Sequence, residues 1–116
     1  MFPVTLIPHT SYLIPEIMFL IAYDIENDRL RLRTANKLLA VGCIRLQFSV
    51  FAGELAGALF KETEAWLKKN MDTSKFPDDK ILILSLGPEQ LKAMKWIGKP
   101  PQEWALLTDP PDVLFL

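Results

Sequence analysis

The sequence predicts an α+β domain in which helices cover one face of a β-sheet. Two observations indicate this fold class: segments typical of strands and of helices alternate along the chain, and the helix-like segments carry apolar residues at helical spacing. We expect one domain, because 116 residues is the size of a typical domain and half of the residues are hydrophobic.

The first predicted strand covers residues 19–25. Side chains alternate across a strand, so Phe19, Ile21 and Tyr23 share a bulky face with Ile25. This face suits packing under helices. The opposite face is smaller and ends in Asp24.

A helix is predicted next, over residues 29–41. Asn27 or Asp28 can cap its start by accepting free backbone N–H groups. Gly42 is a natural left-handed residue at its end. Its apolar positions recur at helical spacing and are Leu32, Ala35, Leu38 and Leu39.

Residues 44–51 alternate with a period of two, as in a strand. Gly53 then permits a turn or a bulge, and a second helix is predicted over residues 54–70. The apolar side of that helix consists of Leu55, Leu59, Trp66 and Leu67.

The last third of the chain predicts a polar loop over 72–80 and a buried strand over 81–86. Residues 89–97 fit either a helix or, in their second half, a short strand, and residues 112–116 read as a terminal strand. Helices on one face leave the other face of the sheet uncovered. An isologous homodimer is the simplest way to cover it.

Composition excludes several classes of protein. The net charge of −1 argues against a strongly basic nucleic-acid binder, although residues 18–50 hold five basic and three acidic side chains. The single cysteine, Cys43, excludes a disulfide framework, and we expect a buried structural thiol and a cytoplasmic protein. The only histidine is His9, so a zinc site is not expected, and no apolar run is long enough to span a membrane.

Residues 1–17 are apolar but have no basic start and contain three prolines, which is not typical of a signal peptide. We expect either a genuine N-terminal extension or an artefact of an upstream start site. The predicted domain covers 18–98, and 99–116 form a tail ending in the terminal strand.

The first predicted strand ends in Tyr23-Asp24-Ile25, and the following helix carries Arg31 and closes at Gly42. The string Arg45-Leu46-Gln47-Phe48-Ser49-Val50-Phe51-Ala52-Gly53 comes next, and the segments Asp79 to Leu86 and Leu91 to Gly98 come later in the chain. Together these features resemble the family-two CRISPR-associated proteins, the small dimeric subunits of spacer acquisition that are known as endoribonucleases. The string is similar to the family's pattern of Arg, aliphatic, Gln, any residue, Ser-Val-Phe, any residue, Gly, and the two later segments are similar to the family's late strand and the segment after it. The likeness covers 18–98 well, 99–116 loosely and 1–17 not at all. One departure is Leu30, where the family often has an arginine.

The resemblance implies a ferredoxin-like βαββαβ sandwich with an extra C-terminal strand, assembled as a homodimer in which the terminal strand can join the partner's sheet. Such a fold needs a hairpin between its second and third strands. The sequence leaves two positions open for that turn, near Gln47–Ser49 or at Gly53.

The resemblance also implies a site. Asp24 is the expected catalytic residue and Mg²⁺ ligand, since a two-fold axis would bring two copies of it together, and paired carboxylates can hold a hard cation. The alternative is that Asp24 only organises the turn after its strand through an Asx-type bond. The residues expected to contact nucleic acid are Arg31, Arg33, Lys37 and Arg45. The residues expected to line the dimer interface are Ser49 and Phe51. The alternative for the basic residues is an ordinary solvated helix face.

Three functions therefore remain open. The first is a dimeric scaffold that binds double-stranded DNA during spacer integration, together with the CRISPR integrase subunit. The second is a Mg²⁺-dependent endonuclease that cleaves single-stranded RNA or double-stranded DNA at the paired Asp24 site. The third is a ferredoxin-like regulatory module that binds a ligand, which the Gln47–Gly53 string disfavours.

Overall fold

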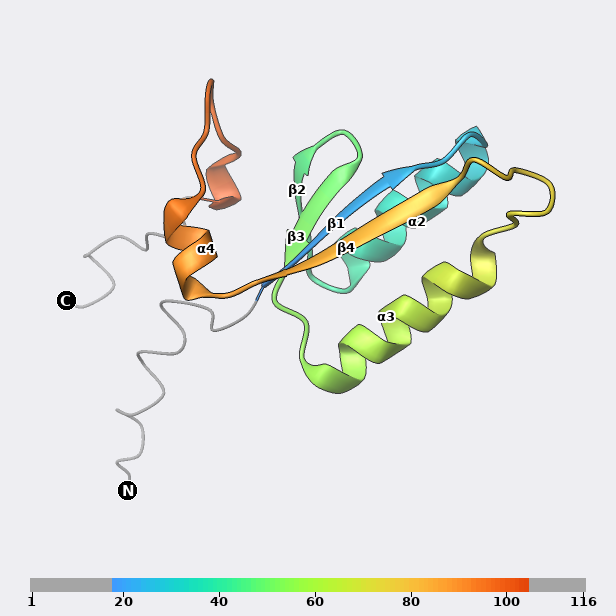
Figure 1. Ribbon diagram of the computed structural model, residues 1–116, viewed down its shortest axis with the longest axis horizontal. Coiled ribbons are helices and arrows are strands. Elements are labelled where there is room, and N and C mark those ends of the chain that lie inside the picture. The colour runs from blue at the N-terminus through green and yellow to red at the C-terminus, as the bar shows by residue number, and fades with distance from the viewer. Residues whose placement is uncertain (1–17, 105–116) are drawn as a thin grey trace.

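A computed structural model describes residues 18–104. Figure 1 shows the strands beside the long helices, with a short helix at one end of the sheet. In chain order the elements are β1 (Met18–Asp24), α2 (Asp28–Ala40), β2 (Ile44–Gln47), β3 (Val50–Gly53), α3 (Gly57–Asn70), β4 (Lys80–Leu86) and α4 (Pro88–Ala93). The first six follow the βαββαβ order, so the predicted α+β, ferredoxin-like fold is confirmed.

The sheet has the order β2-β3-β1-β4, and every neighbouring pair of strands is antiparallel. β1 therefore lies inside the sheet, where Asp24 at its end is opposite Lys80 at the start of β4. β2 and β4 are the two edges. This arrangement brings the two ends of the domain's sequence, residues 18–24 and 80–86, side by side (Figure 1).

The main core lies between the sheet and the two long helices. Ile21, Tyr23 and Ile25 are buried there against Leu38 and Phe51, with Phe19 packed at the margin. The prediction that the bulky face of the first strand packs under the helices is confirmed.

The buried face of α2 differs from the predicted one. Leu32 is 63% exposed and Leu39 is 45% exposed, so two of the four expected positions face solvent. The helix instead buries Leu30, Thr34, Ala35 and Leu38. A helix turns by about 100° per residue. Leu32 is therefore nearly opposite the stripe formed by residues 30, 34 and 38.

Local signals set both ends of α2. The Asn27 side chain accepts the backbone N–H of Leu30 at 2.9 Å, which confirms one of the two predicted caps. At the other end Gly42 has φ of 102°, and its N–H donates to the Leu39 carbonyl while the Cys43 N–H donates to the Leu38 carbonyl. This pair of bonds is the Schellman arrangement, and it turns the chain directly into β2.

The β2–β3 hairpin turns at residues 48–49, as the first of the two predicted positions requires. Gly53 instead ends β3, and the reason for glycine there is space. A Cβ atom at Gly53 would lie 2.6 Å from the Cys43 Sγ. Cys43 is 4% exposed, and burial raises the pKa of its thiol to about 11, as expected for a structural cysteine.

One predicted boundary needs correction, and one ambiguous segment is resolved. The second helix begins at Gly57 rather than at residue 54, although Leu55 before it is buried in the core. Of the ambiguous segment 89–97, the first half is helical in α4 and residues 94–97 form no strand. The predictions made for 1–17 and for the terminal strand 112–116 lie outside the described residues.

The second face of the sheet is covered only at one end. There Met18, Ala52 and Leu86 pack against Leu91 of α4 and against Trp104. Figure 1 shows α4 and the segment after it gathered at that end of the sheet.

Beyond this end the second face is open. On β4, Leu82 is 61% exposed and Leu84 is 49% exposed, and they lie opposite Ala22 and Leu20 of β1. The predicted uncovered apolar face is therefore present.

Candidate functional site

Asp24 lies at the end of β1 and belongs to the open face, because it alternates with Leu20 and Ala22 along the strand. Its side chain is 80% exposed. The Nζ of Lys80, its cross-strand neighbour, lies 3.6 Å from the Asp24 Oδ2. The carboxylate is thus available to solvent, with one ammonium group beside it.

The alternative role for Asp24, an Asx-type bond to the following turn, has no support in the structure. Asn27 provides the side-chain bond that starts α2. Within residues 18–104, the one polar contact found for the Asp24 side chain is the ion pair with Lys80.

Two other side chains hold the loop that follows Asp24. The Arg31 Nη1 donates to the Ile25 carbonyl at 2.9 Å and to the Glu26 carbonyl at 2.8 Å, and the Arg31 Nη2 pairs with Asp28. Arg31 therefore fixes the carbonyl groups of the loop. Its predicted contact with a phosphate would have to compete with these bonds.

Asp79 fixes the same loop from the other side, and the sequence analysis missed it. Its Oδ1 accepts the Glu26 N–H at 2.8 Å, and the residue is only 7% exposed. Its Oδ2 is buried without a hydrogen-bond partner. The sequence alone gives no signal for this role, because only the antiparallel register, which places Lys80 opposite Asp24, brings the residue before Lys80 next to the residues after Asp24.

Two of the predicted basic residues contact a tryptophan of the second helix. The guanidinium carbon of Arg33 and the Nζ of Lys37 each lie 5.8 Å from the centre of the Trp66 ring. Arg33 also bonds to the Asn70 side chain. These cations join α2 to α3, and the exposed position of Arg33 leaves it within reach of a phosphate.

The fourth predicted basic residue, Arg45, belongs to the hairpin. Its Nε donates to the Phe48 carbonyl at 3.1 Å across the turn. Its guanidinium carbon lies 5.2 Å from the centre of the Phe48 ring and 5.0 Å from the centre of the Phe51 ring. Arg45 thus makes these contacts within the hairpin, apart from those of the other three basic residues, and it remains exposed.

The two residues predicted for the dimer interface have defined places in one chain. The Ser49 carbonyl accepts the Tyr23 N–H at 3.1 Å, so it ties the hairpin turn to β1. Phe51 is completely buried in the helix-side core and has no surface that a partner could touch directly. A part for Ser49 and Phe51 in an interface stays a prediction, and for Phe51 it would be indirect.

The side chains of one chain do not make a magnesium site. No group of three or more acidic, histidine or cysteine side chains within residues 18–104 could hold a metal ion. Asp24 offers one carboxylate with the Lys80 ammonium beside it, so a cation would need further oxygen ligands from elsewhere.

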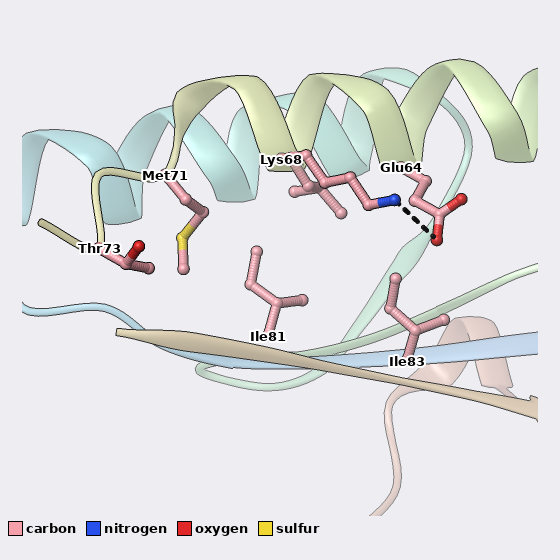
Figure 2. A pocket seen from close by; sticks show the side chains of 7 residues that line it. Glu64, Lys68, Met71, Thr73, Ile81 and Ile83 are labelled. Carbon is pink, nitrogen blue, oxygen red and sulfur yellow. Dashed lines mark ion pairs between the residues drawn. The ribbon is translucent and has the colours of Figure 1, made fainter. Parts of the chain in front are cut away.

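A cleft lies between α3 and the edge strand β4, with a volume of about 430 Å³. Figure 2 shows Ile81 and Ile83 pointing from β4 toward the helix, with Met71 at one end. Its two charged residues are Glu64 and Lys68, whose ion-pair atoms are 4.0 Å apart. The cleft is apolar and has no pair of groups suited to acid–base or nucleophilic chemistry.

The fold and the motif residues define a small ferredoxin-like domain with an exposed aspartate at the end of its first strand. Residues 17–94 match the family described as CRISPR associated protein Cas2. This match covers more than half of the chain. The protein belongs to the Cas2 family of CRISPR-associated proteins.

Individual relatives agree with this assignment. The chain is 35% identical over 82 residues to a CRISPR-associated endoribonuclease Cas2 of Aeropyrum pernix, covering 71% of this chain and 86% of the relative. It is 33% identical over 94 residues to a protein of the same description from Synechocystis, covering 81% and 92%.

Solved structures show the same fold. A Cas2 crystal structure from Streptococcus pyogenes superposes with a TM-score of 0.58 at 28% identity, covering 70% of this chain and 99% of that one. A hypothetical protein from Thermus thermophilus gives a TM-score of 0.61 at 26% identity, covering 74% and 95%. Family membership argues against the regulatory ligand-binding module. No helix within residues 18–104 is long and apolar enough to cross a membrane.

Proposed function

We propose that the protein is a dimeric DNA-binding scaffold of CRISPR spacer acquisition, acting with the integrase subunit. Family membership supports the place in CRISPR adaptation. The observation that carries the scaffold role is the open sheet face, where exposed leucines share a face with the Asp24 carboxylate and, within residues 18–104, no cluster of three metal-ligating side chains is present. Such a surface is suited to assembly more than to catalysis.

The dimer forms through the open face. Leu82 and Leu84 would be buried against a second copy, and an isologous contact would use the same residues twice. β4 is an edge strand, which natural proteins usually cover. The predicted terminal strand, residues 112–116, would pair with the β4 edge of the partner.

The DNA contacts are electrostatic. Arg33 and Lys37 on α2 and Arg45 on the hairpin are the cations we assign to phosphates, with Arg31 in a supporting position on its loop. Phosphate contacts position a duplex without reading its sequence. Binding is therefore expected to be independent of sequence and to weaken as salt rises.

A second candidate is a Mg²⁺-dependent endonuclease, as the names of the relatives from Aeropyrum pernix and Synechocystis suggest. Asp24 favours it, because the carboxylate is exposed on the face through which we propose that the subunits meet. Two copies across a two-fold axis would repel each other unless a cation or a proton lies between them. In this candidate the pair of Asp24 side chains holds Mg²⁺.

One set of measurements separates the two candidates. The purified protein and its Asp24→Asn variant are incubated with single-stranded RNA and with double-stranded DNA, with and without Mg²⁺. The scaffold predicts duplex binding by both proteins and no cleavage that depends on Asp24. Cleavage by the wild-type protein that requires Mg²⁺ and disappears in Asp24→Asn would favour the endonuclease. Absence of duplex binding at low salt would contradict the scaffold.

A further inference from the structure

A small recess lies between the start of α2 and the β2–β3 hairpin, with a volume of about 230 Å³. Its lining combines aromatic, cationic and apolar side chains and consists of Tyr23, Asp28, Arg31, Leu32, Ala35, Arg45 and Phe48. Asp28 is already paired with Arg31. The charge left over in the recess is therefore the positive charge of Arg45.

Phe48 is the unexplained member of this group. It is 75% exposed and stands at the hairpin turn, where polar residues and glycine are usual. It takes no part in either core cluster. An exposed aromatic ring in a tight turn contributes little to folding, so its role is to be sought in binding.

The ring of Phe48 is connected to the core through Arg45. The Arg45 guanidinium carbon lies 5.0 Å from the centre of the buried Phe51 ring and 5.2 Å from the centre of the Phe48 ring. The bond from the Arg45 Nε to the Phe48 carbonyl keeps the turn in this position. The guanidinium occupies one face of the Phe48 ring, and the high exposure of the residue leaves the rest of the ring open to a ligand.

A flat aromatic ligand with a negative group nearby fits this arrangement. Nucleic-acid bases stack on aromatic side chains irrespective of sequence, and an adjacent arginine can bind the phosphate. In the interior of a duplex both faces of a base are already stacked on neighbouring bases, so an interior base pair cannot use such a platform, whereas an unpaired base can.

We propose that the recess binds one unpaired nucleotide of a single strand, with Phe48 as the stacking platform and Arg45 as the phosphate contact. This inference rests on the proposed function, because both require the protein to bind nucleic acid. It adds a base-stacking contact at Phe48 for single-stranded ends or loops, whereas the phosphate contact at Arg45 is shared with a bound duplex.

The test compares variants in their affinity for a single strand and for a duplex. Phe48→Ala is measured by fluorescence anisotropy with oligo(dT) and oligo(U) of about a dozen nucleotides and with a duplex of similar length. Loss of one stacked base is expected to weaken single-strand binding by about 5- to 150-fold. Duplex affinity is expected to stay within about twofold, since phosphate contacts dominate it. Phe48→Trp should keep single-strand affinity, and its fluorescence should fall when the strand binds.

Phe76, a half-buried aromatic residue, provides the control. It is an aromatic residue in the loop before β4, with the Lys75 Nζ 5.5 Å from its ring centre, and it lies outside the recess. Phe76→Ala should change neither affinity. If Phe48→Ala weakens binding of oligo(dT) but not of oligo(U), or the reverse, the subsite is confirmed and its preference between these two strands is defined.

Unchanged single-strand affinity in Phe48→Ala, or an equal loss for single strand and duplex, would overturn the subsite. If the wild-type protein binds duplex but no single strand, the subsite fails while the proposed scaffold stands. If it binds neither nucleic acid, both fail.

Discussion

Replacing both exposed leucines of β4 is expected to dissociate the proposed dimer. Leu82 and Leu84 are 61% and 49% exposed, so together they expose about as much apolar surface as one whole leucine. Burying one leucine contributes roughly 1.5–3 kcal/mol, and an isologous interface does so twice. The double variant Leu82→Gln/Leu84→Gln should therefore raise the dimer dissociation constant by about two to four orders of magnitude.

The assay is sedimentation equilibrium over a wide range of protein concentration. The control is Leu32→Gln/Leu39→Gln, since those two leucines are 63% and 45% exposed on α2 and match the β4 pair in chemistry and exposure. The control variant should dimerise like the wild type. If the β4 variant also dimerises normally, or the control variant is the one that dissociates, the open face is not the interface.

Three further changes test the fold around the site. Asp79→Ala removes the acceptor of the Glu26 N–H and should lower the free energy of unfolding by about 1–2 kcal/mol in urea titrations. Asp79→Asn keeps an oxygen acceptor and should change the free energy of unfolding by less than about 1 kcal/mol. Equal effects of the two variants would exclude the role of Asp79 in holding the loop. Gly53→Ala forces a Cβ to within 2.6 Å of the Cys43 Sγ and should cost about 1–3 kcal/mol, part of which Cys43→Ala should restore. Burial raises the pKa of the Cys43 thiol from 9.0 to about 11, so the thiol of the unfolded chain ionises at lower pH than that of the folded chain. The free energy of unfolding should therefore fall as pH rises from 9 to 11. The same pH dependence in Cys43→Ala would assign the fall to other groups.

The parts of the fold that could be predicted depend on local chemistry. The helix-facing side of β1 follows from strict alternation of large apolar residues. The start and the end of α2 follow from Asn27 and Gly42, because capping bonds and a positive φ involve only the nearest residues. The need for a hairpin after β2 follows from the family resemblance and not from local chemistry, because residues 44–51 contain no glycine or proline; the turn lies at residues 48–49.

The rest depends on contacts between distant segments. Asp79 holds the loop after Asp24 across 53 residues of sequence, and only the strand register brings them together. Arg31 is the residue type expected to contact a phosphate, yet its guanidinium donates to the carbonyl groups of the loop before its own helix. Leu32 has the spacing of a core residue, but the sheet meets the helix on another side.

The central claim is that the protein serves spacer acquisition as a scaffold and not as a nuclease. Asp24→Asn tests it, because the side chain is 80% exposed and its loop is held by other residues, so the variant should fold and dimerise normally. The measurement is acquisition of new spacers in cells that carry Asp24→Asn as the only copy of the protein, read by sequencing the CRISPR array. The scaffold predicts acquisition at the wild-type rate. Loss of acquisition by a variant that remains folded, dimeric and able to bind duplex would show that the carboxylate is needed and would contradict the scaffold.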